Sequence, residues 1–184
     1  MVRIGLHGSF YATGQGHGTD PAIVGGLLGF HPDDSRIKNS FAFAERDALH
    51  FEIGEIDLGP HAHPNSVDLD LRREDVALTI RAASVGGGSI QIQQIGPFPV
   101  DIRGALETLV FWHLDVSGFL ARITAVLACA GINVASIRTS RFKRGDHALT
   151  VIEVDGKCSG ELLSVIGGLP YLERMVRLPV LPGF

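Results

Sequence analysis

The chain has 184 residues, 45% hydrophobic and 20% charged, which is an ordinary composition for a globular protein of one large domain or two small ones. Its formal net charge of −4 gives no reason to expect a nucleic-acid partner, and no apolar run is long enough to span a membrane. No signal-like leader precedes the first apolar stretch, so we expect a cytoplasmic protein.

The first predicted elements flank a glycine-rich stretch. Residues 2–9 are mostly apolar and predict a strand, and the apolar residues of 20–29 recur at helical spacing. Gly14, Gly16 and Gly18 lie between them. Three glycines in five residues allow unusual backbone angles and the close approach of another molecule. We therefore expect a strand-to-helix turn here that forms a functional loop.

His17 stands in the middle of this loop, and we expect it to be exposed beside a helix N-terminus. Thr19 or Asp20 can cap that helix, and Pro21 then fits its first turn. A helix N-terminus favours negative charge, such as a substrate carboxylate. The alternative is a plain loop with a solvated histidine.

The rest of the first half predicts one sheet and one more helix. The helix has an apolar stripe of Ile37, Phe41, Ala44 and Ala48. Alternating residues after it predict a hairpin, with its turn at 73–75. The expected elements are a helix at 34–48 and strands at 50–54, 67–71, 76–80 and 90–93. The first half is thus an α/β layer, a mixed sheet with two helices.

Gly96, Pro97 and Pro99 cannot continue a central strand, so a boundary is expected near them. We divide the chain into a first domain at 1–96, a linker at 97–104 and a second domain at 105–184. The second domain predicts strands at 106–112, 132–141, 148–155 and 172–178, with helices at 120–130 and 162–166. This order is the ferredoxin-like βαββαβ arrangement, and the fold class is α+β.

The cysteines and one pair of histidines decide whether this chain is expected to bind a metal. Cys129 is expected to be buried in a helix and Cys158 to lie in a loop, and two distant thiols cannot hold an iron–sulfur cluster or a structural zinc by themselves. His61 and His63 have the spacing of a metal pair, but nothing nearby completes a ligand set. A turn shaped by Pro64 is the favoured interpretation, and we expect no metal in this chain.

A second candidate site joins the first strand and helix of the second domain. Ser117 can cap the helix, and Gly118 would let a small ligand approach the backbone N–H groups. Asn133 is expected to lie close by. The alternative is a simple helix cap.

The second half resembles an ACT domain, a βαββαβ module that commonly binds amino acids. The residues that carry the resemblance are Asp115-Val116-Ser117-Gly118, Ile123, Leu127, Gly131-Ile132-Asn133 and Val151-Ile152-Glu153-Val154-Asp155. The usual pattern has Pro where this chain has Ser117. The resemblance implies an effector site at Asp115, Ser117, Gly118 and Asn133, and a homotypic ACT–ACT contact.

The first half is similar to the β subunit of bacterial iron–sulfur L-serine dehydratases. The matching motifs are His7-Gly8-Ser9, Thr13-Gly14-Gln15-Gly16-His17-Gly18-Thr19-Asp20, Ile23-Val24-Gly25-Gly26-Leu27-Leu28-Gly29, His63-Pro64-Asn65 and Ser84-Val85-Gly86-Gly87-Gly88. In that family a substrate-binding allosteric domain precedes an ACT domain.

This resemblance implies conversion of L-serine to pyruvate and ammonia, with a [4Fe–4S] cluster held by the cysteines of a partner α chain. It implies His17 as the base or a proton carrier and Thr19 as an orienting residue. The loop that faces substrate and partner would comprise Gly14, Gly16, Gly18, Asp20, His63 and Asn65.

Family β chains usually carry a P-S-S-S-H-T motif before the first strand, and the printed sequence does not include it. Two alternatives follow: the sequence is truncated, or this copy is catalytically impaired. A non-catalytic regulatory protein that binds an amino acid through its ACT domain is therefore the competing functional hypothesis. A metal-dependent enzyme that uses His61 and His63 is a third.

Overall fold

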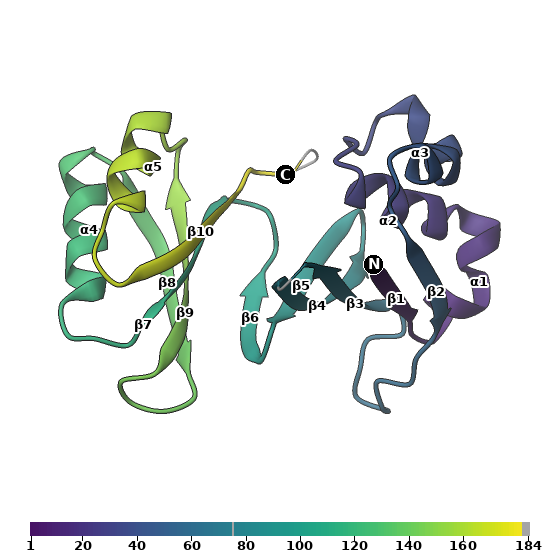
Figure 1. Cartoon of the computed structure of the whole chain (residues 1–184), viewed down its shortest axis with the longest axis horizontal. Helices are drawn as coiled ribbons and strands as arrows, with labels where there is room; N and C mark the ends of the chain where they lie inside the picture. The colour runs from purple at the N-terminus through teal and green to yellow at the C-terminus, as the bar shows by residue number, and fades with distance from the viewer. Residues whose placement is uncertain (75, 182–184) are drawn as a thin grey trace. The chain divides into compact units, whose positions relative to one another are not determined.

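The computed structural model describes residues 1–74 and 76–181 of the chain, which divides into two compact units, Met1–Pro97 and Phe98–Phe184. Each unit has its own helices and strands (Figure 1). The division falls inside the range that the sequence assigned to a linker. Part of that range, Phe98–Ile102, forms a strand, β6, rather than an extended connection.

The first unit contains a mixed sheet in the strand order β2-β1-β3-β4-β5. β1 pairs in parallel with β2, and the other pairings among these strands are antiparallel. The predicted mixed sheet is therefore confirmed, including the hairpin of β3 and β4; Asp75 of its expected turn lies outside the described residues. The strands are β1 Val2–Leu6, β2 Phe51–Glu55, β3 Ser66–Arg73, β4 Val76–Gly86 and β5 Ser89–Ile95.

One face of this sheet is covered by helices. Val2, Ile4 and Leu6 alternate along β1 and are buried, together with Val24 and Ala44 from the helices. The helices are α1 Ser9–His17, α2 Thr19–Leu27, the 3-10 helix η1 Ser35–Asn39 and α3 Ser40–Arg46. The two helices expected from the sequence are thus three α-helices and a 3-10 turn.

The largest difference from the sequence prediction is α1. The strand ends at Leu6, not at residue 9, and the glycine-rich stretch begins inside a helix instead of forming a loop. Glycine in a helix costs about 1 kcal/mol relative to alanine but leaves the backbone hydrogen bonds intact. A helix is therefore allowed here, although the local pattern favoured a turn. The left-handed residue Gly18, at φ 71°, separates α1 from α2.

The helix expected at 34–48 is also different. Asp34 accepts a hydrogen bond from the Arg36 N–H and starts a 3-10 turn, and α3 begins only at residue 40. Phe41 is 47% exposed, so the predicted stripe is wrong at that position, and Ala48 is exposed beyond the helix. The break rotates α3 so that Ser40 is buried instead, donating to the Pro21 carbonyl at 2.8 Å.

The second unit confirms the predicted βαββαβ arrangement. Its four-stranded antiparallel sheet has the order β10-β7-β9-β8, and both helices contribute to one cluster of buried side chains with the sheet. The elements are β7 Glu107–Leu114, α4 Phe119–Cys129, β8 Asn133–Arg141, β9 His147–Asp155, α5 Gly160–Gly167 and β10 Leu172–Leu178.

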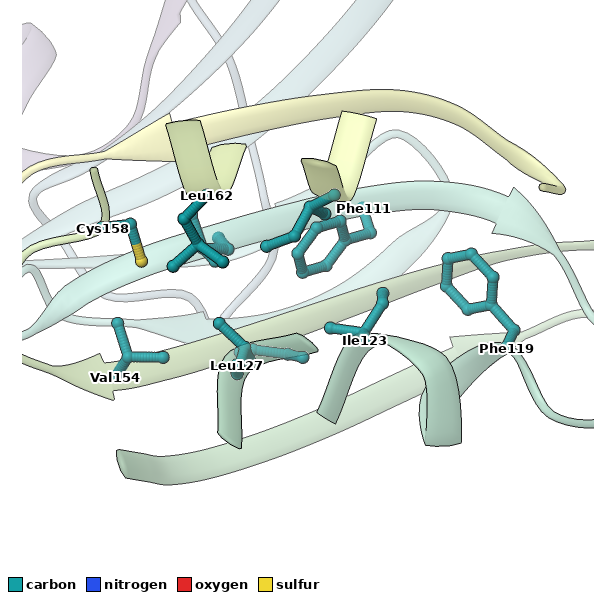
Figure 2. Close-up of a cluster of buried hydrophobic side chains, with 10 residues drawn as sticks. Phe111, Phe119, Ile123, Leu127, Val154, Cys158 and Leu162 are labelled. Atoms are coloured by element: carbon teal, nitrogen blue, oxygen red, sulfur yellow. The ribbon is translucent and has the colours of Figure 1, made fainter. Parts of the chain in front are cut away.

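Figure 2 shows the buried cluster of this unit, into which Phe119, Ile123 and Leu127 project from α4. Cys158 belongs to the same cluster and is 1% exposed, whereas Cys129 is exposed. The predicted burial of Cys129 is therefore wrong, and the loop position of Cys158 does not keep it at the surface. Cys129 is the last residue of α4 and does not lie on the buried side of that helix, which is formed by Phe119, Ile123 and Leu127. The loop that contains Cys158 folds back over the core, so Cys158 is buried.

In the part of the chain that the structure describes, no helix combines the length and the apolar character needed to cross a membrane.

Candidate functional site

His17 is the last residue of α1, and its side chain is exposed. Its Nδ1 lies 3.0 Å from the Thr13 carbonyl oxygen, one helical turn earlier. A carbonyl oxygen only accepts hydrogen bonds, so Nδ1 must carry the proton. In the neutral imidazole Nε2 then keeps its lone pair, and it accepts no hydrogen bond from the described residues. The structure thus presents a fixed tautomer with a free basic nitrogen.

Asp20 lies in the first turn of α2, three residues after His17. Its Oδ1 is buried, and no donor in the described residues hydrogen-bonds to it. Gly14 is buried against the same atom: a Cβ at Gly14 would lie 3.1 Å from Asp20 Oδ1 and 3.7 Å from Leu6 Cδ1. A buried acceptor without a donor costs about 1–3 kcal/mol. Asp20 Oδ1 is therefore a polar atom whose burial the described residues do not compensate.

Neither Thr19 nor Asp20 caps α2, contrary to the prediction. Gly18 occupies the N-cap position, and no side chain makes a cap hydrogen bond there. Pro21 lies in the first turn as expected. The structure therefore brings Gly14 against Thr19 and Asp20 where α1 meets α2, and His17 is the last residue of α1 before Gly18.

Most of α1 makes little contact with its own unit. Only Gly14 is buried among its nine residues, Phe10 is half-buried, and Tyr11 is 46% exposed. Gly16 has nothing within 4 Å of an added Cβ. A helix that buries so little surface is not held by hydrophobic packing within this chain. Its exposed side is available to another molecule.

His63 and Asn65, which the sequence grouped with the glycine-rich stretch, lie at the opposite end of α1. The Pro64 carbonyl oxygen accepts from the Phe10 N–H at 3.4 Å and would lie 2.8 Å from a Cβ at Gly8. The rise of a helix separates this end from His17 by about 12 Å. The structure does not bring the two groups of residues into one cluster.

The 63–66 turn is held by its own hydrogen bonds. The Asn65 N–H donates to His63 Nδ1 at 3.1 Å, and the Ser66 hydroxyl donates to the His63 carbonyl at 2.7 Å. The lone pair of His63 Nδ1 is therefore already used. Among the described residues no group of three or more His, Cys, Asp or Glu side chains could hold a metal ion.

His7 was not selected from the sequence as a site residue, although it lies in a matching motif. It follows β1 and is half-buried, with Nδ1 3.2 Å from the Ile56 carbonyl and 3.3 Å from the Leu58 nitrogen. Its position directly after a buried strand was the sequence signal that could have identified it.

In the second unit, Asp115 holds the β8–β9 turn. Its Oδ2 accepts from the Arg141 guanidinium and from the Gly145 N–H, and these hydrogen bonds lower the pKa of Asp115. Ser117 is exposed and does not cap α4, because left-handed Gly118 takes the N-cap position at φ 83°. The predicted serine cap is therefore wrong, and no side chain of the described residues caps the first N–H groups of α4.

Asn133 does not lie near this loop, contrary to the prediction. It donates to Asp155 Oδ2 at 2.6 Å, at one end of β9. Leu114, which directly precedes the loop, pairs with His147 at the other end of β9. Eight residues of strand separate the two ends by roughly 27 Å. Within one chain, the four expected effector residues form two separate groups.

Comparison with known proteins gives both units a family. The family model for the serine dehydratase beta chain matches residues 1–94, and the ACT domain model matches residues 108–167. The L-serine dehydratase beta chain of Peptoniphilus asaccharolyticus is 34% identical over 173 residues, which cover 92% of this chain and 77% of that protein. The chain belongs to the serine dehydratase beta-chain family. The resemblance drawn from the motifs is confirmed.

Two further relatives match very different shares of this chain. The probable L-serine dehydratase beta chain of Bacillus subtilis is 34% identical over 177 residues, which cover 96% of this chain and 80% of that protein. A chloroplastic D-3-phosphoglycerate dehydrogenase of Arabidopsis thaliana is 28% identical over only 91 residues, half of this chain and 16% of that protein. Membership in the serine dehydratase beta-chain family therefore rests on the matches that span nearly the whole chain.

Proposed function

We propose that this chain is the β subunit of a two-chain L-serine dehydratase that converts L-serine to pyruvate and ammonia together with an α chain. Membership in the serine dehydratase beta-chain family supports the subunit role. The observation that carries the proposed catalytic contribution is the exposed imidazole of His17 at the end of α1. Its Nδ1 is held by the Thr13 carbonyl, and Nε2 has no hydrogen-bond partner in the described part of the chain.

In this proposal His17 Nε2 takes the α-proton of L-serine. A neutral histidine suits this role because imidazole is the side chain that most often acts as a general base in enzymes. The hydroxyl group leaves as water with the proton that the imidazolium gives back. The resulting aminoacrylate tautomerises to an imine, which a water molecule hydrolyses to pyruvate and ammonia. Thr19 orients the substrate or the imidazole from the start of α2.

Asp20 contributes a negative charge to the same junction. Its buried Oδ1 has no donor among the residues that the structure describes, and the α-ammonium group of an amino acid is a donor that the proposed reaction would supply. That contact requires a shift of the last turn of α1, where Gly14 covers the oxygen. Glycines weaken this turn by about 1 kcal/mol each, so the shift has a low cost.

The residues of this chain do not suit the iron–sulfur cluster that the proposal includes. Cys129 and Cys158 lie on α4 and in the core of the second unit, and the described residues contain no cluster of three or more metal-binding side chains. We therefore assign the [4Fe–4S] cluster to the α chain, and the roles given to His17, Thr19 and Asp20 do not depend on it.

The poorly packed side of α1 is the surface that we assign to the α chain. Tyr11, Gln15 and His17 are exposed along it, and Tyr11 and Gln15 are one helical turn apart. A partner bound there would stabilise α1 and bring His17 to the interface between the chains.

The test measures serine-dependent pyruvate formation after anaerobic mixing of this chain with its α chain. We expect activity only from the mixture, and His17→Ala should abolish turnover while association and thermal unfolding stay unchanged. His31→Ala, which removes an exposed histidine outside α1, is the matched control and should keep turnover. A His17→Ala complex with near wild-type turnover would eliminate the assignment of the base.

Two other outcomes bear on the subunit role. If the chains associate without activity, the segment with the P-S-S-S-H-T motif is the next element to supply. If the chains do not associate, the two-chain proposal fails and a regulatory protein that binds amino acids takes its place.

A further inference from the structure

Helices α4 and α5 cover the same face of the second unit's sheet and lie beside each other (Figure 1). Their outward side is the α4–α5 surface, which comprises Arg122, Ala125, Ala128 and Cys129 of α4 with Glu161 and Val165 of α5. A hollow of about 450 Å³ lies in this surface, between the second half of α4 and the first half of α5.

The α4–α5 surface carries very little charge. Arg122 is the one charged residue of α4, and Glu161 is the one charged residue of α5. The solvent-facing side of a surface helix normally carries several charged residues. Here Ala125 and Ala128 are exposed instead, and Val165 is 58% exposed. A weakly charged, partly apolar surface of this kind is typical of a site that another molecule covers.

The two charges lie toward opposite ends of the surface. Arg122, Ala125 and Cys129 share one side of α4, and about 10 Å of helix separates Arg122 from Cys129. Glu161 lines the hollow together with Cys129. The Arg122 guanidinium instead lies 6.0 Å from the centre of the Tyr171 ring, beyond the other end of α5. The surface thus has a positive end and a negative end.

This arrangement is complementary to itself. A two-fold axis through the middle of the surface would place the positive end of one copy on the negative end of the other. Arg122 of each copy would then face Glu161 of the other. Neither side chain forms an ion pair within the part of the chain that the structure describes, so both are available. Ala125 and Val165 would lie near the axis and form an uncharged centre.

The edge strand β8 is the other surface on which a second copy could pair, and it is more polar. The Ser136 hydroxyl donates to Glu153 Oε2 at 2.6 Å, and Arg138 is exposed. Ile137, at the middle of β8, is 42% exposed. Charged and polar side chains along an edge strand oppose pairing with another chain. The α4–α5 surface is therefore the better candidate for a contact between copies.

We propose that the α4–α5 surface binds the same surface of a second copy of this chain in a two-fold symmetric dimer. The uncharged centre excludes water, and the two Arg122–Glu161 pairs fix the orientation of the copies. The resemblance to an ACT domain did not say which surface would form a homotypic contact. The dimer does not depend on the proposed reaction of the first unit, and it is measured without the α chain.

The first test is sedimentation velocity of the full chain over a range of concentrations, where we expect a monomer–dimer equilibrium. Val165→Asp should leave the chain monomeric, because it places two carboxylates near the axis. Val76→Asp changes a valine of the first unit that is 56% exposed, and this matched control should dimerise like the unchanged chain. Thermal unfolding should show that both variants are folded, since both positions are exposed.

Charge reversal tests the orientation of the copies. Arg122→Glu and Glu161→Arg should each weaken the dimer about tenfold, because each leaves like charges facing at both ends. The double variant should regain the affinity of the unchanged chain, since its charges have only exchanged places. Damage to a helix would not be repaired by a second reversal. Arg138→Glu on β8 is the control and should keep the affinity.

Cross-linking with a short bismaleimide separates the two surfaces. In a Cys129→Ser background, Ala125→Cys should give a covalent dimer and Ile137→Cys should not. The proposal is overturned if the unchanged chain stays monomeric, if the double charge reversal fails to restore the dimer, or if Ile137→Cys alone cross-links. It is also overturned if Val165→Asp prevents binding of the α chain to an otherwise monomeric chain, because the α chain would then cover this surface.

Discussion

Helices α1 and α4 have similar lengths but differ in how many of their side chains are buried. α4 directs Phe119, Ile123 and Leu127 into a closed core, and all three are at most 1% exposed. α1 buries only Gly14 and carries glycine at two of its last four positions. α4 is therefore stabilised by its own unit, whereas α1 contributes little to the stability of the first unit.

The two units therefore differ in which kinds of residue they bury and which they leave exposed. The second unit buries large apolar side chains and keeps a cooperative core. The first unit retains an exposed imidazole, a buried carboxylate oxygen without a donor among the described residues and a helix with little support. Local features that lower stability are expected at functional sites, where they are retained for another purpose.

The largest expected difference in stability is between two variants that each lose one large side chain, one from α4 and one from α1. Ile123→Ala should destabilise the chain by about 2–5 kcal/mol, because it leaves a cavity in the core. Tyr11→Ala should change stability by no more than about 0.5 kcal/mol, since Tyr11 is 46% exposed. Chemical denaturation of both variants checks the pair. A comparable loss for Tyr11→Ala would show that α1 is better supported than its contacts indicate.

A pH effect is expected in the second unit from His113, which is 2% exposed and stacks on Phe119. Burial lowers the pKa of His113, although the hydrogen bond to the Leu114 carbonyl opposes this. That bond takes the Nδ1 proton, so neutral Nε2 accepts from the Thr150 hydroxyl at 2.8 Å. Protonation would reverse this bond, with Nε2–H donating to the Thr150 hydroxyl oxygen, and would place a positive charge on a buried ring.

The unfolded chain therefore takes up this proton at higher pH than the folded chain does. The folding stability that neutral His113 contributes should be fully present above the pKa of histidine in the unfolded chain, about 6.5. It should be lost as the pH is lowered from there to the lower pKa of the folded chain. The slope is at most about 1.4 kcal/mol per pH unit. Denaturation at several pH values should show that His113→Gln loses less stability than the unchanged chain as the pH is lowered. His31→Gln, at an exposed position, is the control and should keep the slope of the unchanged chain. An unchanged slope would contradict the assignment.

The smallest expected effects come from two glycines of α1. Gly16→Ala should stabilise the isolated chain by about 0.5–1 kcal/mol, because an added Cβ meets nothing and alanine favours a helix. Gly14→Ala should instead destabilise it by about 1 kcal/mol, because the Cβ would press on Asp20 Oδ1. Thermal unfolding of both variants measures the difference. Equal gains would show that Asp20 can move aside freely.

Sequence patterns predicted the second unit well because its signals are local and consistent. β7 is buried on both faces, as its continuous apolar run predicts, and the Ile123 and Leu127 stripe fixes the inner side of α4. Glycines at 118 and 131 end or begin elements where a positive φ is needed. Each choice of residue agrees with the final fold, so the order of elements followed from the chain alone.

The first unit shows where local reasoning fails. Glycine is compatible with a turn and with a helix, so residues 14–17 could not be assigned by their own preferences. The helix there brings Gly14 against Asp20 and joins α2 through Gly18. The same limit applies to Asn133, whose distance from residues 115–118 is set by the sheet register and not by sequence separation.

By itself the sequence determined the family, the two-part organisation and the βαββαβ order, because motifs and periodicity are written in consecutive residues. Only the tertiary structure decided that His17 and His63 lie at opposite ends of α1, that Asp20 buries an oxygen with no donor among the described residues, and that Arg122 and Glu161 lie toward opposite ends of one helical surface. These arrangements depend on strand register and helix packing between distant segments, which no local pattern of residues specifies.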